Sequence, residues 1–401
     1  YNLACDIAKN AERCFRYELG VEGTSYIQPG YWNSLRSGLQ AGESLQLDVR
    51  RMENDYRNLN RREFECTKHI SLAQIDPRAL VNLKGGGSCQ FNLPEELFDL
   101  DYPGHYFRRI KSVGISIPCV AGPYTTVNAT LRLLKNMVRI NTTGAAYEHN
   151  NDDGVFTDDD RFRQSNVRVS AIATSSAQND SGMFELSFRD ERYLPFEGAG
   201  AISSWQIDLM SEETLRTFSY ATISDVILHV RYTAREDAGL FRQNAIDHLK
   251  NVVSGTEPQL PQWRVFDLLR EFPTEWYAML HPTGGAAQIL SLGVTGQHFP
   301  FLAQEKIVHM QSAWVFAKNN VPLSVMIDPP FDNTNQALGG TRIALPKADP
   351  SKVYSSGGFD GQDVTLDETT PWALQFLAAG ALNPTDIAEC YLVVGYVLAD
   401  T

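Results

Sequence analysis

The hydrophobic periodicity of the chain changes near residue 89, and this change limits the folds that are open to it. Before it, apolar residues recur at helical spacing, as Leu3, Ile7, Ala11, Cys14 and Phe15 do in the first segment. After it, apolar residues alternate with a period of two, which is typical of β-strands. A helical N-terminal part is therefore expected to precede a β-rich part.

A second helix is predicted from about residue 33 to about residue 71, where no proline interrupts the apolar positions. At 1.5 Å per residue, about 38 residues would span roughly 57 Å. This length favours a coiled coil or a bundle, so residues 1–84 are predicted to form a helical shaft. Its mixed charges fit either a solvated face with i, i+4 pairs or a surface between subunits, and both interpretations stay open.

Residues 76–88 contain the signals of a break between elements. Asp76-Pro77 is predicted to start a short helical turn, and Gly85-Gly86-Gly87-Ser88 is predicted to be a flexible linker. No lysine and serine or threonine follow these glycines at P-loop spacing, so a phosphate-binding loop is not expected.

Four alternating runs of apolar residues indicate strands in the middle of the chain: Val113 to Ile117, Val127 to Leu133, Phe184 to Phe188 and Val226 to Tyr232. No βαβ pattern joins them, which favours antiparallel sheets packed as a sandwich. One helix is expected at about 240–253, a connector at 255–262 and a short helix at about 272–280. Further strands are expected around Val308–Phe316, Leu323–Ile327 and the apolar segment 390–398, the last buried on both faces.

The predicted fold class is therefore α+β, with a long N-terminal helical hairpin or coiled-coil-like shaft followed by antiparallel β-sandwich-type modules and a few short helices. Three domains are expected: the shaft at 1–84, a first β-rich part at 85–254 and a second at 255–401.

Composition excludes several classes of protein. The 401 residues carry a net charge of −13, which opposes binding to nucleic acid. No 18-residue apolar run is present, so no simple membrane-spanning helix is expected. The chain begins at Tyr1 without the pattern of a signal peptide, and its opening resembles the middle of a helix, so we expect a piece of a longer protein or a processed product.

No metal or cofactor site is predicted. The six cysteines are too sparse for a disulfide framework and are expected to be reduced. Cys66 and His69 could share a helix face, but no second pair of ligands has matching spacing. The acidic segment 148–160 partly fits the offsets of a calcium loop, with His149 at the first ligand position, and a solvated loop is the preferred interpretation.

No catalytic motif is present in the sequence, and the chain is expected not to be an enzyme. Carboxylate pairs such as Asp190 and Glu191, or Asp99 and Asp101, keep a hydrolase open as a third hypothesis. His229 is expected to be packed or hydrogen-bonded within a strand. Five tryptophans are expected to pack in cores, with a carbohydrate-binding or adhesion module on a helical stalk as the alternative; they are Trp205, Trp263, Trp276, Trp314 and Trp372.

Several long segments resemble one known family. They include SYIQPGYWNSL at 25–35, LQAGESLQLDVRRMENDY at 39–56 and TKHISL at 67–72. More specific are the segments at 91–131, with DYPGHY, and at 172–209, with RDERYLPFEGAGAISSW, followed by TISDVILHVRYTARE at 222–236. Together they resemble the C-terminal region of the A subunits of bacterial Tc (ABC-type) insecticidal toxins. The resemblance is strong over 1–254 and weaker beyond, and residues 332–370 match no motif of the family.

This resemblance implies a non-enzymatic docking module with no cofactor and no partner-binding residues assigned. In the family, the A subunit is a pentamer with a central helical channel, and its C-terminal region holds the TcB–TcC cocoon so that the toxic cargo enters the channel. Residues 1–72 would then be the upper end of the channel bundle and 91–401 the TcB-binding domain. The resemblance also implies a secreted or cell-surface protein that meets its target membrane through parts outside this chain.

Overall fold

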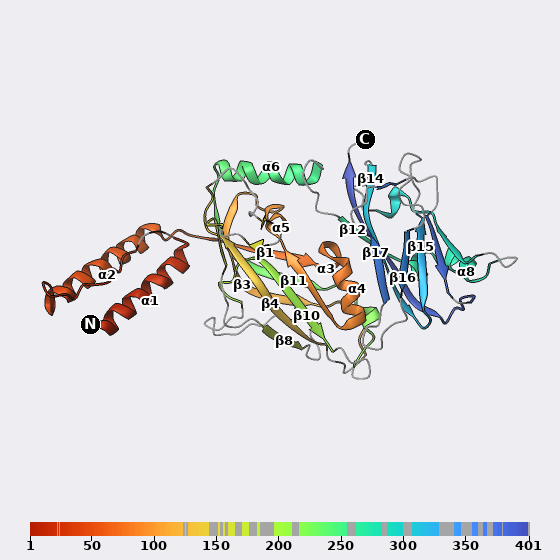
Figure 1. Ribbon diagram of the computed structural model, residues 1–401, viewed down its shortest axis with the longest axis horizontal. Coiled ribbons are helices and arrows are strands. Elements are labelled where there is room, and N and C mark those ends of the chain that lie inside the picture. Colours follow the sequence, from red (N-terminus) through yellow and green to blue (C-terminus); the bar gives the residue numbers. More distant parts are fainter. Residues whose placement is uncertain are drawn as a thin grey trace.

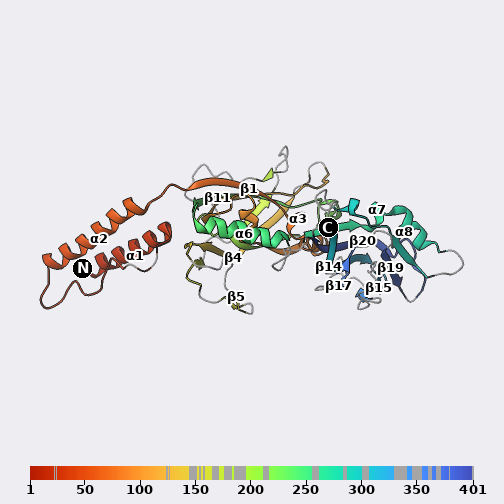
Figure 2. The same cartoon turned by 90° about the horizontal axis from the view of Figure 1, so that it is seen from above.

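The computed structural model has an α+β fold in which a helical hairpin and two β-sandwiches follow one another along the long axis (Figures 1 and 2). The structure describes residues 1–21, 23, 25–122, 125, 127–143, 151–152, 155–156, 159–164, 171–175, 183–184, 196–210, 216–254, 262–282, 287–299, 307–328, 341–345, 355–359, 364–366, 372–378 and 380–399. The predicted α+β class and antiparallel sheets are confirmed.

Helices α1 (Asn2–Leu19) and α2 (Leu39–Leu59) form the hairpin. The buried residues of α1 recur at alternating steps of three and four, which is the spacing of a coiled-coil seam; they are Cys5, Ala8, Glu12, Phe15 and Leu19. The segment between the helices packs into the same seam, because buried Glu12 accepts hydrogen bonds from the backbone N–H groups of Tyr26 (2.8 Å) and Ile27 (3.3 Å).

The prediction of one helix over residues 33–71 is wrong, and with it the helical shaft over 1–84. Helix α2 ends at Leu59, and residues 64–71 form strand β1 (Phe64–Ser71) at the edge of a sheet. From Phe64 onward the side chains follow a period of two, with Cys66 and Ile70 turned toward the core. Pairing of all eight residues with β11 satisfies the backbone and outweighs the weak helical pattern.

The first sandwich consists of two antiparallel sheets, ordered β1-β11-β3-β9 and β2-β10-β4-β7, with β8 also paired to β4. The strands are β2 (Ser88–Leu93), β3 (His105–Ser116), β4 (Asn128–Arg139), β7 (Phe162–Gln164), β8 (Ala171–Ser175), β9 (Met183–Phe184), β10 (Ile202–Leu209) and β11 (Ile227–Glu236). A separate short hairpin pairs β5 (Asn151–Asp152) with β6 (Val155–Phe156). Inward residues of both sheets share one core around Trp205, which confirms the strands predicted near 113–117, 127–133 and 226–232.

Short helices close this core: α3 (Leu72–Ile75), α4 (Pro77–Gly86) and α5 (Glu95–Asp99), with the 3-10 turn η3 (Tyr220–Thr222). The helical start at Asp76-Pro77 is confirmed, because the Asp76 carboxylate caps the N–H of Ala79 at 3.0 Å. The linker predicted at the glycine cluster is wrong. Gly85 is buried within α4, and Gly87 (φ 73°) ends that helix in the left-handed conformation.

Helix α6 (Leu240–Ser254) confirms the predicted helix and lies above α5 (Figure 1). The second sandwich follows, with sheets ordered β12-β20-β14-β17 and β13-β19-β15-β16, and β18 beside β14. Its elements are β12 (Gln262–Asp267), α7 (Leu268–Glu271), α8 (Pro273–Leu280), β13 (Ile289–Leu292), η5 (Gly296–His298), β14 (Ile307–Asn319), β15 (Leu323–Asp328), β16 (Thr341–Leu345), β17 (Ser355–Phe359), β18 (Val364–Thr365), β19 (Trp372–Leu377) and β20 (Ile387–Ala399). The strand expected to be buried on both faces is confirmed as β20, since Val394 packs in the sandwich core and Val393 on the opposite face.

The inward and outward side chains of strand β14 do not alternate regularly along its whole length. Its register with β20 shifts between Met310 and Ser312, so one residue is inserted as a β-bulge. Val308 and Met310 therefore face the same core as Ala313 and Val315, whereas Trp314 and Phe316 lie on the other face. There they meet Val81 of α4, so the bulge provides the apolar contact between the two sandwiches.

Cations strengthen this contact. The Arg78 guanidinium lies 4.3 Å from the ring centroid of Trp263 and 5.6 Å from that of Trp314, and Lys84 lies 5.4 Å from that of Tyr391. Burial lowers the pKa of Lys84. Helix α4 of the first sandwich thus presents two cations to an aromatic face of the second.

Candidate docking surface

The residues singled out for chemistry do not form an active site among the described residues. Asp99 pairs with Arg108, and Asp101 pairs with Lys68 at 2.6 Å, so this carboxylate pair is divided between two separate ion pairs. Asp190 and Glu191 lie outside the described residues, as do most of segment 332–370 and His149, the first candidate ligand of the 148–160 loop. Where the chain is described, no three His, Cys, Asp or Glu side chains group as metal ligands.

The structure also places the cysteines, two histidines and the tryptophans for which the sequence made predictions. All six cysteines are free, as expected. The prediction that Cys66 and His69 share a helix face is wrong, because both lie on strand β1, where an odd spacing puts them on opposite faces. His229 is hydrogen-bonded, as predicted, through Nε2 to Ser116 Oγ at 2.8 Å. Three tryptophans are buried in cores: Trp205, Trp276 and Trp372.

A buried ionic cluster holds helix α5 to the first sandwich. Glu95 accepts hydrogen bonds from Arg139, at 2.7 Å from Nη2, and lies 3.4 Å from Arg108 Nη1. Arg108 also pairs with Asp99, whose side chain has no exposed surface. Burial raises the pKa of Asp99 to about 7, while the Arg108 charge acts in the opposite direction. Two arginines and two carboxylates thus share one buried site. Each charge is compensated there by an opposite charge, and removing one group would leave another buried without its partner.

A second cluster joins the helical hairpin to the first sandwich. Gly20 (φ 68°) ends α1 against the ring of Phe107, a buried residue of β3 whose own φ is 53°. Arg235 lies 4.0 Å and Arg109 4.6 Å from the centroid of that ring, and Glu63 accepts a hydrogen bond from each arginine.

The same cluster caps the end of helix α1. Arg235 Nη1 donates to the carbonyl of Leu19 at 2.7 Å, and Arg163 Nη1 donates to that of Arg16 at 3.1 Å. Tyr17 Oη donates to the carbonyl of Gly198 at 2.7 Å. Arg235 thus gives the Leu19 carbonyl at the helix end a partner, whereas the Arg16 carbonyl also accepts the backbone N–H of Gly20 at 2.9 Å. Both arginines complement the dipole of the helix. We name these residues the hairpin clamp: Tyr17, Gly20, Glu63, Phe107, Arg109, Arg163 and Arg235.

The outer face of β2, β10 and β4 is a polar surface with side-chain pairs across its strands. Ser88 Oγ donates to Asp208 at 2.6 Å, and Gln90 Nε2 donates to Gln206 at 3.2 Å. Ser204 Oγ donates to Asn92 Oδ1 at 2.7 Å. These cross-strand pairs hold the polar side chains in fixed positions on the surface.

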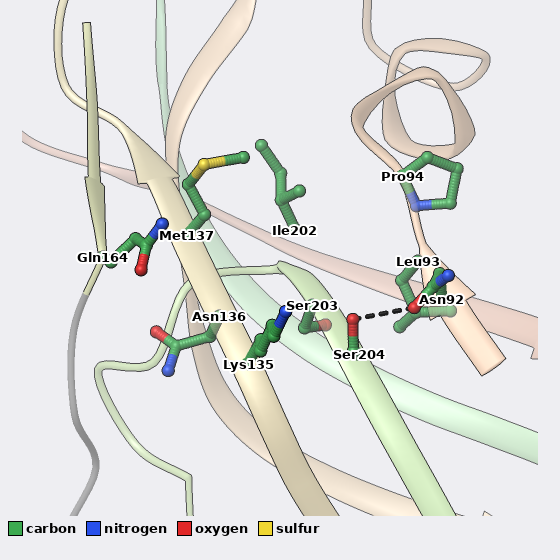
Figure 3. A pocket seen from close by; sticks show the side chains of 10 residues that line it. All are labelled: Asn92, Leu93, Pro94, Lys135, Asn136, Met137, Gln164, Ile202, Ser203 and Ser204. Carbon is green, nitrogen blue, oxygen red and sulfur yellow. Dashed lines mark hydrogen bonds between the residues drawn. The ribbon is translucent and has the colours of Figure 1, made fainter. Parts of the chain in front are cut away.

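A bulge and a hollow interrupt this polar face. The register of β10 with β4 shifts after Ser204, and the extra residue leaves Leu134 and Lys135 both exposed. Beside them lies a cavity of about 140 Å³. Figure 3 shows the side chains that line it and the hydrogen bond between two of them, Ser204 and Asn92. Ten residues line it: Asn92, Leu93, Pro94, Lys135, Asn136, Met137, Gln164, Ile202, Ser203 and Ser204.

Similarity to known proteins identifies the family. The sequence profile described as "Tc toxin complex TcA C-terminal TcB-binding domain" matches residues 1–234. The chain belongs to this family. The matched residues include the helical hairpin, the hairpin clamp apart from Arg235, and the whole polar face, whereas the second sandwich lies beyond them.

Individual Tc toxin subunits are similar to parts of the chain. The toxin subunit YenA2 of Yersinia entomophaga is 37% identical over 256 residues, which is 63% of this chain and 18% of that protein. TcdA4 of Morganella morganii is 26% identical over 56% of this chain and 10% of its own, with a TM-score of 0.39. TcaA-TcaB of Yersinia pseudotuberculosis is 25% identical over 55% of this chain and 12% of its own, with a TM-score of 0.38. The chain thus spans less than a fifth of the length of each of these relatives.

No local pattern in the sequence identified the polar face as a docking surface or pointed to the hairpin clamp. Ser88, Gln90 and Asn92 alternate with Cys89, Phe91 and Leu93, which indicates an exposed strand face but names no partner. The clamp joins residues from Tyr17 to Arg235, and such contacts leave no local signal.

Proposed function

We propose that this chain is the docking platform of a Tc toxin A subunit, where it receives the TcB subunit of a TcB–TcC cocoon and aligns it with a helical channel. The observation that carries the proposal is the family match over the hairpin and the first sandwich. The fixed pairs of the polar face fit a docking role, because a surface that is already ordered loses little entropy on binding.

Assembly into a homo-pentamer in the full-length protein is part of this proposal. Besides its buried seam, α1 carries a second apolar stripe of exposed residues, Leu3, Ile7 and Cys14. At 3.6 residues per turn, this stripe lies on the side of the helix opposite to the seam. On α2, Leu39 and Leu47 are also exposed. A helix that is apolar on two sides suits a barrel in which one side meets its hairpin partner and the other a neighbouring subunit.

We place the contact with TcB on the polar face around Leu134 and Lys135. The bulge presents an apolar side chain and a cation next to a hollow, which is the combination of anchor and polar rim found in protein interfaces. The outer face of the other sheet offers no apolar anchor among residues 65, 67 and 69 of β1, which are Glu65, Thr67 and His69. TcB would therefore contact the first sandwich opposite to β1.

The finer parts of the proposal follow the family. We propose that toxic cargo passes from the cocoon into the channel, that the protein is secreted or presented at the bacterial surface, and that other parts of the A subunit meet the target membrane. No helix among the described residues is long and apolar enough to span a membrane. The division of the β-rich part into 85–254 and 255–401 stays a prediction, and we expect no enzymatic activity.

The alternative of a carbohydrate-binding module has lost most of its support. Three of the five tryptophans that suggested it are buried, and Trp263 and Trp314 lie against Arg78 between the sandwiches. A glycan-binding platform needs aromatic rings that are open to the ligand.

The deciding experiment is native mass spectrometry of the full-length A subunit with and without purified TcB–TcC. We expect a pentamer that binds one cocoon. A full-length pentamer that binds no TcB–TcC under any salt condition would refute the docking role, and a monomer that still binds TcB–TcC would refute only the pentamer.

A further inference from the structure

Strands β1 and β11 bring two histidines together that are 160 positions apart in the sequence. His69 and His229 lie directly opposite each other in the ladder. Their Nδ1 atoms are 2.6 Å apart, and their ring centroids are 4.8 Å apart at an interplanar angle of 73°. The pair lies on the outer face of its sheet, and His69 is exposed. Solvent ions can therefore reach it.

We propose that His69 and His229 form a binding site for a divalent transition metal that accepts two imidazole nitrogens, with water as its remaining ligands. At a separation of 2.6 Å, one proton lies between the two Nδ1 atoms in either tautomeric arrangement. The metal ion takes the place of this proton, which moves through solvent to Nε2 of the same ring. Both imidazoles thus stay neutral, and each Nδ1 lone pair forms one bond to the metal.

Ser116 supports the arrangement from the third strand. Its Oγ lies 2.8 Å from His229 Nε2. When Nε2 carries the proton and donates it to this hydroxyl, Nδ1 of His229 is left as a metal ligand facing His69. A hydrogen bond of this kind to the distal ring nitrogen is the usual way in which proteins orient a ligating histidine.

The distance between the nitrogens favours some metals over others. With metal–nitrogen bonds of about 2.0–2.1 Å, a right angle at the metal places the two nitrogens about 2.9 Å apart, and a tetrahedral angle about 3.3 Å. The pair must therefore open by about 0.3 Å for square-planar Cu²⁺ or Ni²⁺, and by about 0.7 Å for tetrahedral Zn²⁺. We infer the order Cu²⁺, then Ni²⁺, then Zn²⁺, in which geometry adds to the intrinsic preference for copper.

Binding would tie the edge of the sheet to its neighbour. Strand β1 is the edge strand that follows the helical hairpin, and β11 is its only sheet partner among the described strands. A metal held by one histidine from each strand would cross-link them without changing the register. The expected result is a higher melting temperature in the presence of the metal.

The test is titration of the untagged chain with CuCl₂, NiCl₂ and ZnCl₂, followed by calorimetry and, for copper, electron paramagnetic resonance. We expect one equivalent of Cu²⁺ with two equatorial nitrogens, and a rise in melting temperature. His69→Ala should lose both, and it should fold because His69 is exposed. Ser116→Ala should weaken binding about tenfold.

His281→Ala is the matched control, because it removes another exposed histidine, one that stacks on Tyr277 in the second sandwich. This variant should bind copper as the wild type does. Equal binding by His69→Ala and wild type, loss of binding in His281→Ala, or a wild type that binds no copper would each overturn the proposal.

Discussion

Gly20 and Phe107 lie so close that a Cβ atom on the glycine would be 2.3 Å from Cε2 of the phenylalanine ring. Both residues have left-handed backbone conformations, and they meet where α1 ends against the first sandwich. The guanidinium groups of Arg109 and Arg235 lie against the same ring. The position of the helical hairpin on the sandwich is thus fixed by a contact that leaves no room for a side chain at residue 20.

Replacing Gly20 tests this contact. Gly20→Ala combines the cost of a left-handed alanine with a clash that the buried ring cannot relieve, so we expect a loss of about 2–4 kcal/mol in the free energy of unfolding. Chemical denaturation measures it. Gly30→Ala is the control, because Gly30 also has a positive φ (92°) but no atom lies within 4 Å of the place that a Cβ would take, and it should cost about 1 kcal/mol. Equal losses in both variants would contradict a specific role for the Phe107 contact.

The second stripe of α1 predicts how the assembly responds to charge. Ile7→Asp puts a carboxylate in the middle of the stripe and should abolish the pentamer of the full-length A subunit, because an unpaired charge is costly to bury. Native mass spectrometry gives the readout. Ala4→Asp adds the same charge at an exposed position between the two apolar sides of α1 and should leave assembly unchanged. A pentamer that tolerates Ile7→Asp would show that this stripe does not face a neighbour.

The polar face predicts which substitutions weaken docking. Leu134→Asp should lower the affinity for TcB–TcC tenfold or more, about 1.4 kcal/mol, because it replaces an apolar anchor at the centre of the proposed contact. Biolayer interferometry with the full-length protein measures this change. Thr67→Asp introduces the same charge on the outer face of the opposite sheet, where Thr67 is exposed on β1. If this variant weakens docking while Leu134→Asp does not, TcB contacts the other face.

The buried ionic cluster predicts a dependence of stability on pH. Burial raises the pKa of Asp99 to about 7, against an ordinary value of about 3.9 in an unfolded chain. Because the folded state holds this proton more tightly, its stabilising contribution is complete below about pH 4 and is lost as the pH rises through about 7. The free energy of unfolding of the wild type should therefore fall more steeply between about pH 4 and pH 7 than that of Asp99→Asn.

Urea denaturation at several pH values provides the comparison, with Asp101→Asn as the control. Asp101 is partly exposed and pairs with Lys68, so its removal should leave the slope unchanged. Identical slopes in the wild type and Asp99→Asn would mean that Arg108 keeps Asp99 ionised throughout this range.

The contact of Arg78 with the second sandwich can be tested by substitution. Arg78→Ala removes a guanidinium from Trp263 and Trp314 and should cost about 1–2 kcal/mol. We expect differential scanning calorimetry to resolve two transitions where the wild type has one. Arg78→Lys keeps the charge but loses the planar stacking, and it should give an intermediate result. A single, unshifted transition in Arg78→Ala would mean that the apolar contact around Val81 suffices.

The sequence predicted the parts of this fold whose signal is local. The alternation around Val113, Leu131 and Leu228 is visible in any short window, and these residues indeed lie in one core. Strand β1 was missed because Arg61 and Arg62 continue the charged pattern of α2, and because its inward side includes Lys68, whose ammonium reaches Asp101. A polar residue on the buried side hides the period of two.

Contacts between distant segments could not be predicted in this way. The family resemblance indicated the docking role, but it assigned no residue to it. The bulge at Leu134 of β4 and the shift in β14 each insert a single residue, and only the pairing with the partner strand reveals which one. His69 and His229 meet only because β1 is a strand, so the helix expected there concealed the pair.

The place of β1 has a mechanical consequence. The strand leaves the sandwich toward the helical hairpin along the long axis of the molecule (Figure 2), and it is paired with β11 over eight residues. A pull on the hairpin along that axis would load these hydrogen bonds in shear, all at once, rather than unzip them one by one. The pairing of β1 with β11 would thereby resist extension and transmit tension from the helical hairpin to the first sandwich.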